Sequence, residues 1–456
     1  MLLTAEAIPG AEDARDSSVG ATSAAEARIA PETRIAPEVE RTLVLWLTNA
    51  SHAANHFQNQ MVSTLYPVIM AELGIGYFQL GTITAIRVVF GNASQIMYGF
   101  LTPFVRRSQL LGVANVVMGL GNLFTGVVGG YSGFIVARTV TSIGGSAQHP
   151  LGASLLSGMF PRSRGTILAL NSSVANIGSL LAPLVAGLLL LVIGWRQIFV
   201  VVAVLCLLVG ATYFVLRDRV GTSGQPASRK ARLARGKQSY LRVLRNRNIM
   251  VVSLVQMVGA AGGEGGVNQT YIGPHLVNDF GLSLTVAGLA LSVFTLGSVV
   301  GPLCFGWLSD RLSRKTIIQT SLLLSALGTL SLAHQDLILS GLIGVLSPWW
   351  PAAQESFLPL LLVNLLLYGG VTSSRQTLTQ ALVADSLADD DRDAAFSVYY
   401  FVAFFSDPIW SLVTGILMEN FGFAFAFSRL SVTYLLGMAL LFLVRDTRQR
   451  TREVAA

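Results

Sequence analysis

Residues 67–107, PVIMAELGIGYFQLGTITAIRVVFGNASQIMYGFLTPFVRR, are matched without a gap by residues 274–314, PHLVNDFGLSLTVAGLALSVFTLGSVVGPLCFGWLSDRLSR. The two stretches agree mainly at glycines, prolines and charged residues, as Gly74 does with Gly281. These residue types mark the ends of helices. The chain therefore contains a structural repeat, and a membrane protein built in this way holds its binding site between the repeats.

The composition indicates a membrane protein, because 52% of the 456 residues are hydrophobic and 12% are charged, against about 25% charged in soluble domains. Uncharged runs such as Leu110–Ala137 are long enough to cross a bilayer as helices. Twelve such segments are predicted: 43–71, 78–102, 109–129, 132–159, 166–191, 195–216, 248–276, 284–308, 316–333, 357–383, 394–417 and 422–443. The fold class is thus all-α, with twelve transmembrane helices in two pseudo-symmetric halves of six.

A second match supports this organisation, since Gly144-Gly145 and Pro183 correspond to Gly369-Gly370 and Pro408. The predicted parts are a disordered cytoplasmic tail (1–41), a six-helix bundle (42–217), a basic cytoplasmic linker (218–247), a second bundle (248–444) and a cytoplasmic tail (445–456). The apolar run 337–346 lies outside the twelve segments. It is either a helical extension of the ninth segment or an interfacial hairpin.

The formal charge of +7 does not indicate nucleic-acid binding, because of where the basic residues lie. Of the 31 Lys and Arg residues, 26 fall on one side of the predicted topology, and Arg196 is alone in the loops of the other side. This positive-inside pattern predicts a multi-pass protein of the cytoplasmic (inner) membrane with both termini in the cytoplasm. The two cysteines, Cys206 and Cys304, lie within helices and indicate no disulfide framework.

The segment Gly306-Trp-Leu-Ser-Asp310-Arg311-Leu-Ser-Arg314-Lys315 resembles the loop motif of the major facilitator superfamily. The resemblance implies a gating loop in which Asp310, Arg311 and Arg314 hold neighbouring helices together in one state. The copy in the first half has Pro103 where the motif has its acid, so the same interaction is not expected there.

Residues 51–190 resemble the fosmidomycin resistance proteins, which are efflux members of that superfamily. The similar motifs are Ser-His-Ala-Ala-Asn-His at 51–56, Ile-Gly-Gly-Ser-Ala-Gln-His-Pro at 143–150 and Asn-Ile-Gly-Ser-Leu-Leu-Ala-Pro at 176–183. This chain departs from the group where His56 replaces an Asp and Leu151 replaces a Glu. The resemblance implies efflux of a small organic molecule against an inward flow of protons.

Helix one carries a polar stripe, because Asn49, His52, His56 and Asn59 recur at helical spacing, with Asn55 beside them. The stripe is either the wall of a substrate cavity, with His52, Asn55 and Asn59 as binding residues, or a set of interhelical hydrogen bonds. His56 can change its charge near neutral pH and is a candidate for proton coupling. A metal site is not expected, because no nearby Cys or carboxylate completes the two histidines.

Three buried arginines favour an anionic or zwitterionic substrate. We expect Arg87 to bind an anion, and Arg375, beside Gln376, to bind a carboxylate or phosphoryl group. Arg138 corresponds to an arginine that the superfamily often ties to proton coupling. The alternative for Arg87 is pairing with a carboxylate such as Asp407 or Glu264, and for Arg375 it is pairing with a carboxylate of the bundle. For Arg138 the alternative is a structural role with hydrogen bonds to helix-end carbonyls.

Two buried carboxylates complete the set of candidates. Glu264 lies within Gly-Gly-Glu-Gly-Gly at 262–266, where glycines let a helix bend or break, and Asp407 precedes Pro408. Both are proposed proton carriers, with permanent pairing to an arginine as the alternative. Tyr271 and Tyr399 are expected to line the cavity. The dipeptide His149-Pro150 is expected to kink helix four with a hydrogen-bonded histidine, and a ligand site at His149 is the alternative.

The sequence therefore predicts a secondary transporter that works by alternating access, with proton-coupled efflux preferred. Uptake by symport or uniport, and a non-transporting sensor or lipid-handling protein, are the alternatives. An enzyme is not expected, because no nucleophile–base pair is recognisable. The absence of a phosphate loop argues against an ATP-driven pump. We expect a monomer in the lipid bilayer, with the substrate and protons as partners, no cofactor and no nucleic acid.

Overall fold

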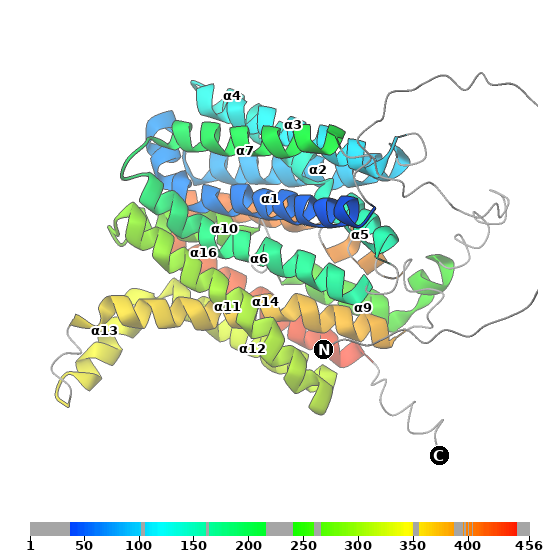
Figure 1. The fold of residues 1–456 in the computed structure, drawn as a ribbon. Helices are drawn as coiled ribbons and strands as arrows, with labels where there is room; N and C mark the ends of the chain where they lie inside the picture. The colour runs from blue at the N-terminus through cyan, green and yellow to red at the C-terminus, as the bar shows by residue number, and fades with distance from the viewer. Residues whose placement is uncertain are drawn as a thin grey trace, which may run out of the picture.

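The computed structural model describes residues 37–101, 105–160, 164–215, 240–259, 266–349, 355–386, 395, 398–399, 401–403 and 405–444. Within these residues the regular structure is helical throughout (Figure 1). Seven of the described helices are long and apolar enough to cross a membrane. The all-α membrane architecture predicted from the repeat is therefore confirmed.

The first half contains the helices of the first six predicted segments. These are α1 (Pro37–Leu73), α2 (Tyr77–Leu101), α3 (Arg107–Val127), α4 (Tyr131–Gly145), the π-helix η1 (Gln148–Gly152), α5 (Ala153–Met159), α6 (Arg164–Leu189) and α7 (Trp195–Val215). The predicted fourth helix is interrupted at its His149-Pro150 step, where η1 separates α4 from α5. The expected kink is thus present, in the form of a wider helical turn.

The second half is less regular. Its helices are α9 (Arg247–Val258), α10 (Val267–Asn278), α11 (Leu284–Arg311), α12 (Arg314–Ala333), α13 (Gln335–Leu346), α14 (Phe357–Asp385), α16 (Asp407–Leu440) and η4 (Leu441–Leu443). The apolar run after α12 forms a separate helix, α13, which the non-helical residue His334 divides from α12. Gly422, with φ of 80°, reverses the chain inside α16, so that this element contains two helices.

Some boundaries differ from the prediction or fall outside the description. Helix α1 begins at Pro37, so the last residues of the predicted tail are helical. The predicted helix over 248–276 is not continuous, because α9 ends at Val258 and α10 begins at Val267. Glu264 lies outside the described residues, as do 1–36, most of the linker and the C-terminal tail.

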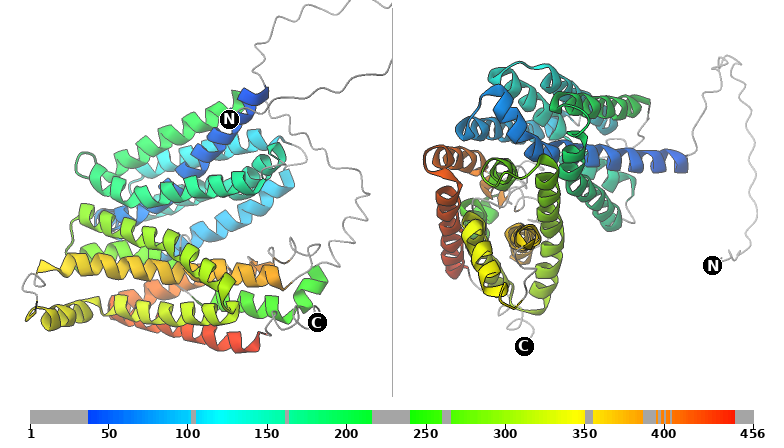
Figure 2. Two further views of the ribbon diagram at one scale, coloured as in Figure 1. Left: turned by 60° about the horizontal axis from the view of Figure 1, so that its bottom comes forward. Right: turned by 90° about the vertical axis from the view of Figure 1, so that its left-hand side faces the viewer.

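The two halves lie side by side, and the helix axes of both halves are roughly aligned (Figure 2). The most extensive contacts between them are those of α2 with α16, α6 with α11, and α1 with α10. The repeat relates α2 to α11 and α6 to the first part of α16. The α2–α16 and α6–α11 contacts are therefore equivalent under the pseudo-symmetry. This is the arrangement expected of parallel repeats about an axis along the membrane normal.

Glycines make these contacts close. A Cβ atom at Gly81 would lie 2.5 Å from the carbonyl oxygen of Ser411, and one at Gly288, its repeat partner, 2.4 Å from that of Pro183. The matching glycines at Gly74 and Gly281 have φ of 62° and 64° and turn the chain at the same end of the molecule. The glycines shared by the repeats are therefore required for turning and for close backbone approach.

Enlarging Gly81 or Gly288 should separate the halves at this end. We expect Gly81→Leu and Gly288→Leu each to destabilise the protein by about 1–3 kcal/mol, as overpacking does elsewhere, and to lower the melting temperature in detergent. The control is Gly306→Leu, because a Cβ atom at Gly306 meets nothing within 4 Å. Equal melting temperatures for all three variants would contradict this account of the interface.

Candidate functional site

A cavity of about 750 Å³, lined by both polar and apolar side chains, lies between the two halves. Helices α1 and α6 line it from the first half, and α10, α11 and α14 from the second. Six amide side chains face it, namely Gln60, Asn176, Asn268, Gln269, Gln376 and Gln380. Gln376 was predicted as a binding residue. Gln60 belongs to the polar face of helix one that is predicted as a cavity wall. The other four are not predicted, because a single amide in an apolar helix carries little signal in the sequence.

Hydrogen bonds cross between the halves beside this cavity. Gln269 donates to the backbone oxygen of Asn59 at 2.7 Å, and Gln60 donates to Thr295 at 3.5 Å. Amide and hydroxyl groups of this kind bond in several orientations. They can therefore exchange partners with a bound molecule or with water.

Arg87 joins two predicted residues of helix one. Its Nη1 donates to Oδ1 of Asn59 at 3.1 Å, and Nδ2 of Asn59 donates to Oδ1 of Asn55 at 3.3 Å. The backbone of Asn59 in turn accepts from the cavity residue Gln269. Hydrogen bonds thus connect Arg87, Asn59 and Asn55, and the middle residue, Asn59, meets the cavity lining at Gln269.

Arg138 is held on several sides inside the first half. Nη1 donates to Asn122 at 3.0 Å and Nη2 to Gln58 at 3.1 Å, while the guanidinium lies 5.3 Å from the ring centre of Phe199. The side chain is 2% exposed. These contacts tie α4 to α3, α1 and α7 and favour a structural role, with side-chain amides as partners in place of the expected helix-end carbonyls.

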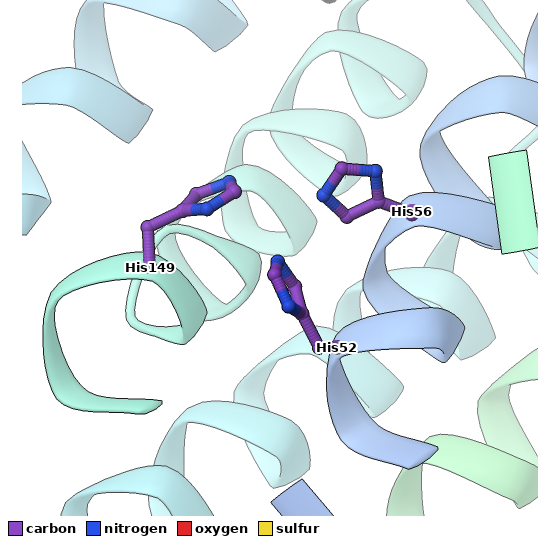
Figure 3. Close-up of side chains that lie close together, drawn as sticks. All are labelled: His52, His56 and His149. Atoms are coloured by element: carbon purple, nitrogen blue, oxygen red, sulfur yellow. The ribbon is translucent and has the colours of Figure 1, made fainter. Parts of the chain in front are cut away.

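Three histidines meet where α1 passes η1 (Figure 3). The ring of His149 lies 5.0 Å from that of His52 and 5.6 Å from that of His56, and the rings of His52 and His56 are 4.7 Å apart. The expectation of no metal site rested on finding only two ligands together. That premise is wrong, because the fold brings His149, distant in sequence, beside the pair.

Two predicted residues, Arg375 and Asp407, lie near the end of α9. Nη1 of Arg375 donates to the backbone oxygen of Gln256 at 3.1 Å, and Ser406 and Trp410 donate to that of Met257 at 2.8 and 3.0 Å. These donors satisfy carbonyls that a helix leaves without partners where it ends. Asp407, next to Ser406, interacts electrostatically with Arg375.

The two predicted tyrosines are buried instead of facing the cavity. The hydroxyl of Tyr271 donates to the backbone oxygen of Ser411 at 2.6 Å, and that of Tyr399 shares a hydrogen bond of 2.7 Å with Thr379. Both side chains are 0% exposed. Tyr399 packs helices of the second half together, whereas Tyr271 also donates to the backbone oxygen of Tyr77 at 3.4 Å and so lies at the contact between the halves.

The predicted gating loop contains an ion pair that the sequence did not identify. Arg314 forms a salt bridge with Asp385 at the end of α14 and donates to Ser309 at 3.3 Å. Arg311 lies over the ring of Trp307 at 3.7 Å. Asp310 belongs to α11, and its side chain is outside the description.

Comparisons with known proteins agree with this architecture. The sequence model of the Major Facilitator Superfamily matches residues 49–272 and 259–456. A probable hexose phosphate transport protein of Chlamydia trachomatis is 24% identical over 60% of this chain and 66% of its own length. The membrane sensor protein UhpC of Escherichia coli is 25% identical over 59% and 64%. The chain thus spans just under two thirds of the length of these two relatives.

Two further similarities concern the predicted subfamily and the fold. The fosmidomycin resistance protein of Escherichia coli is 23% identical over 66% of this chain and 74% of its own length. The crystal structure of a bacterial homolog to the human lysosomal transporter Spinster, in an inward-facing and unoccupied conformation, has a TM-score of 0.74 at 14% identity. It covers 90% of this chain and 97% of its own, which shows a shared fold.

A structural role for Arg138 can be tested by stability. Lysine keeps the charge but lacks the planar fork that reaches Asn122 and Gln58 together. We expect Arg138→Lys to lower the free energy of unfolding by about 1.5–3 kcal/mol, as loss of hydrogen bonds to a charged group does. The matched control is Arg429→Lys, on an exposed position over Phe425. Equal melting temperatures for both variants would contradict the role.

Proposed function

Because the chain belongs to the major facilitator superfamily, we propose that it is a secondary transporter that moves a small organic molecule by alternating access. The observation that supports this most strongly is the cavity, lined by amide, hydroxyl and apolar side chains, between two repeats that touch through glycines. Its volume of about 750 Å³ lies within the range of small-molecule sites, roughly 300–1,000 Å³. Substrate sites at the interface of two repeats are the rule in such transporters.

The lining of the cavity supports a polar substrate. Amide and hydroxyl groups from both halves surround the space, and Arg87 reaches it through Asn59. A small organic anion would gain hydrogen bonds from the amides and the favourable field of Arg87. The relatives named above include a hexose phosphate transport protein, which agrees with an anionic cargo.

We further propose that the structure is the inward-facing state of a protein in the cytoplasmic membrane, with both termini in the cytoplasm. The glycine contacts join the halves at the end of the molecule opposite the start of α1 (Figure 1). The loops at that end are nearly free of basic residues, as expected outside the cell. The similar Spinster homolog was also captured facing inward.

Proton coupling is proposed at Asp407. Arg375, whose positive charge acts on Asp407 without a direct salt bridge between the two, holds the end of α9, where helix seven is interrupted before α10. Protonation of Asp407 would remove the negative charge beside Arg375 and release the guanidinium toward other acceptors. Because Arg375 caps α9, this change would reach the interrupted helix directly, and Glu264 within the interruption is a second proposed carrier.

Efflux by proton antiport is the preferred direction, on the resemblance to the fosmidomycin resistance protein. Uptake by symport or uniport remains the first alternative. A sensor is the second, since UhpC is a membrane sensor protein. Transport by vesicles of known orientation under an imposed pH gradient separates these: export driven by inward protons supports antiport, co-directional flow supports symport, and no flow of any stabilising compound supports a sensor.

The substrate class can be found without a transport assay. A ligand that binds only the folded state raises the melting temperature, by a free energy of about 2.7 kcal/mol at 100 times its Kd. We expect small carboxylates or phosphorylated compounds to stabilise the purified protein and organic cations to leave it unchanged. Stabilisation by cations alone would contradict an anionic cargo.

Replacing Asp407 tests the coupling. We expect Asp407→Asn to abolish the response of transport to the pH gradient while exchange of substrate across the membrane continues. Coupling free energies are typically about 1–3 kcal/mol, so gradient-driven accumulation should fall between about 5- and 150-fold.

The control is Asp336→Asn at the exposed start of α13. This variant also removes one carboxylate charge, but from a residue that is distant from the cavity in the sequence and in the fold. Undiminished gradient-driven accumulation in Asp407→Asn would remove this residue from the coupling scheme, whereas loss in both variants would show a general defect.

A further inference from the structure

The histidine cluster of the first half offers donors for a metal ion. One ligand nitrogen each from His52, His56 and His149 lies within 4.8 Å of the others. We propose that these three imidazoles bind one divalent transition-metal ion of the zinc class. This inference concerns binding by the first half and does not depend on which molecule is transported.

The geometry favours coordination over stacking. The rings stand nearly perpendicular to one another, at 80°, 85° and 75°, and each turns a nitrogen toward the space they share (Figure 3). Zinc–nitrogen bonds of about 2.0–2.1 Å in a tetrahedron place ligand nitrogens roughly 3.3 Å apart. A shift of about 1 Å at each nitrogen closes the observed separation to this value. His149 can make such a shift, because its side chain is exposed on η1.

Hydrogen bonds to α6 orient two of the rings. Nδ1 of His52 lies 2.7 Å from Oδ1 of Asn171, and the Nδ2 group of Asn171 donates to Asn49 at 2.8 Å. The Asn171 oxygen is therefore the acceptor, Nδ1 of His52 carries the proton, and the lone pair of the imidazole is on Nε2. Metal-binding histidines are held in this way by an acceptor on the second nitrogen.

His56 repeats the arrangement one turn further along α1. Its Nδ1 lies 3.0 Å from Oγ of Ser179, so Nε2 is again the nitrogen turned to the other rings. Ser179 lines the central cavity. The proposed ion would thus lie one side chain behind the cavity wall.

The donor set selects the class of ion. Imidazole suits zinc, copper, nickel and cobalt, whereas magnesium and calcium require oxygen ligands. Three protein ligands leave a fourth position for water or the oxygen of a small anion, as in zinc sites that are open. Neutral imidazoles do not cancel the charge of the ion, which makes an anionic fourth ligand favourable.

Metal titration of the full-length protein, purified without a histidine tag, tests the proposal. We expect Co²⁺ to bind at one ion per chain with the visible absorption of a four-coordinate site, and Zn²⁺ to displace it. His52→Ala and His149→Ala should abolish the absorption band. Asn171→Ala should raise the Kd for Co²⁺ by about 10- to 100-fold, as does loss of a hydrogen-bond acceptor that orients a metal-binding histidine.

The matched control is His334→Ala, because His334 is exposed, bonds to Ser428 and lies in the other half. Melting temperatures without metal show whether each variant is folded, and His149, being exposed, is the least disruptive to remove. The proposal is overturned if the wild type shows no four-coordinate absorption. It is also overturned if folded His149→Ala binds Co²⁺ with the wild-type Kd and spectrum.

Discussion

Inside the bilayer no water is present to bond with the backbone, so every interrupted helix must find partners within the protein. Two of the interrupted helices show how the backbone groups find hydrogen-bond partners. At the end of α9, the carbonyls of Gln256 and Met257 accept from Arg375, Ser406 and Trp410. In helix four, the chain widens into η1 at Pro150 and continues as α5. Polar side chains are concentrated at both places. The need to satisfy the backbone inside the bilayer therefore also brings together the groups that can titrate or bind.

The sequence was sufficient for the scaffold because helix ends depend on local residues. Glycine, proline and charge located most helices to within a few residues, as for 195–216 against Trp195–Val215. Contacts between residues on different helices depend on how the helices pack, and this packing cannot be inferred from a single sequence. The pairing of Arg314 with Asp385, the meeting of His149 with His52, and the capping role of Arg375 could therefore not be predicted. Glu264 stays a prediction, since it lies outside the described residues.

The two halves share the contacts that join them and differ in the chemistry that they hold. Gly81 and Gly288 make the same backbone approach on opposite sides of the pseudo-symmetric interface. The imidazoles of the first half, and Asp407 and Arg375 of the second, have no counterparts at the matching repeat positions. Symmetry thus supports a rocking motion, while asymmetry separates the proposed metal site from the proposed proton site. Each can then be altered without removing the other.

The central claim is that the halves rock about the cavity, so that one end opens as the other closes. Pulsed spin-label distances test it most directly, in a background with Cys206 and Cys304 replaced by serine. One pair, at Arg106 and Leu312, spans the halves at the end holding the start of α1, and the other, at Val127 and Phe421, spans them at the opposite end; all four positions are exposed. The account predicts that acidification shifts the two distances in opposite directions. Two distances that stay fixed, or that widen together, would contradict it.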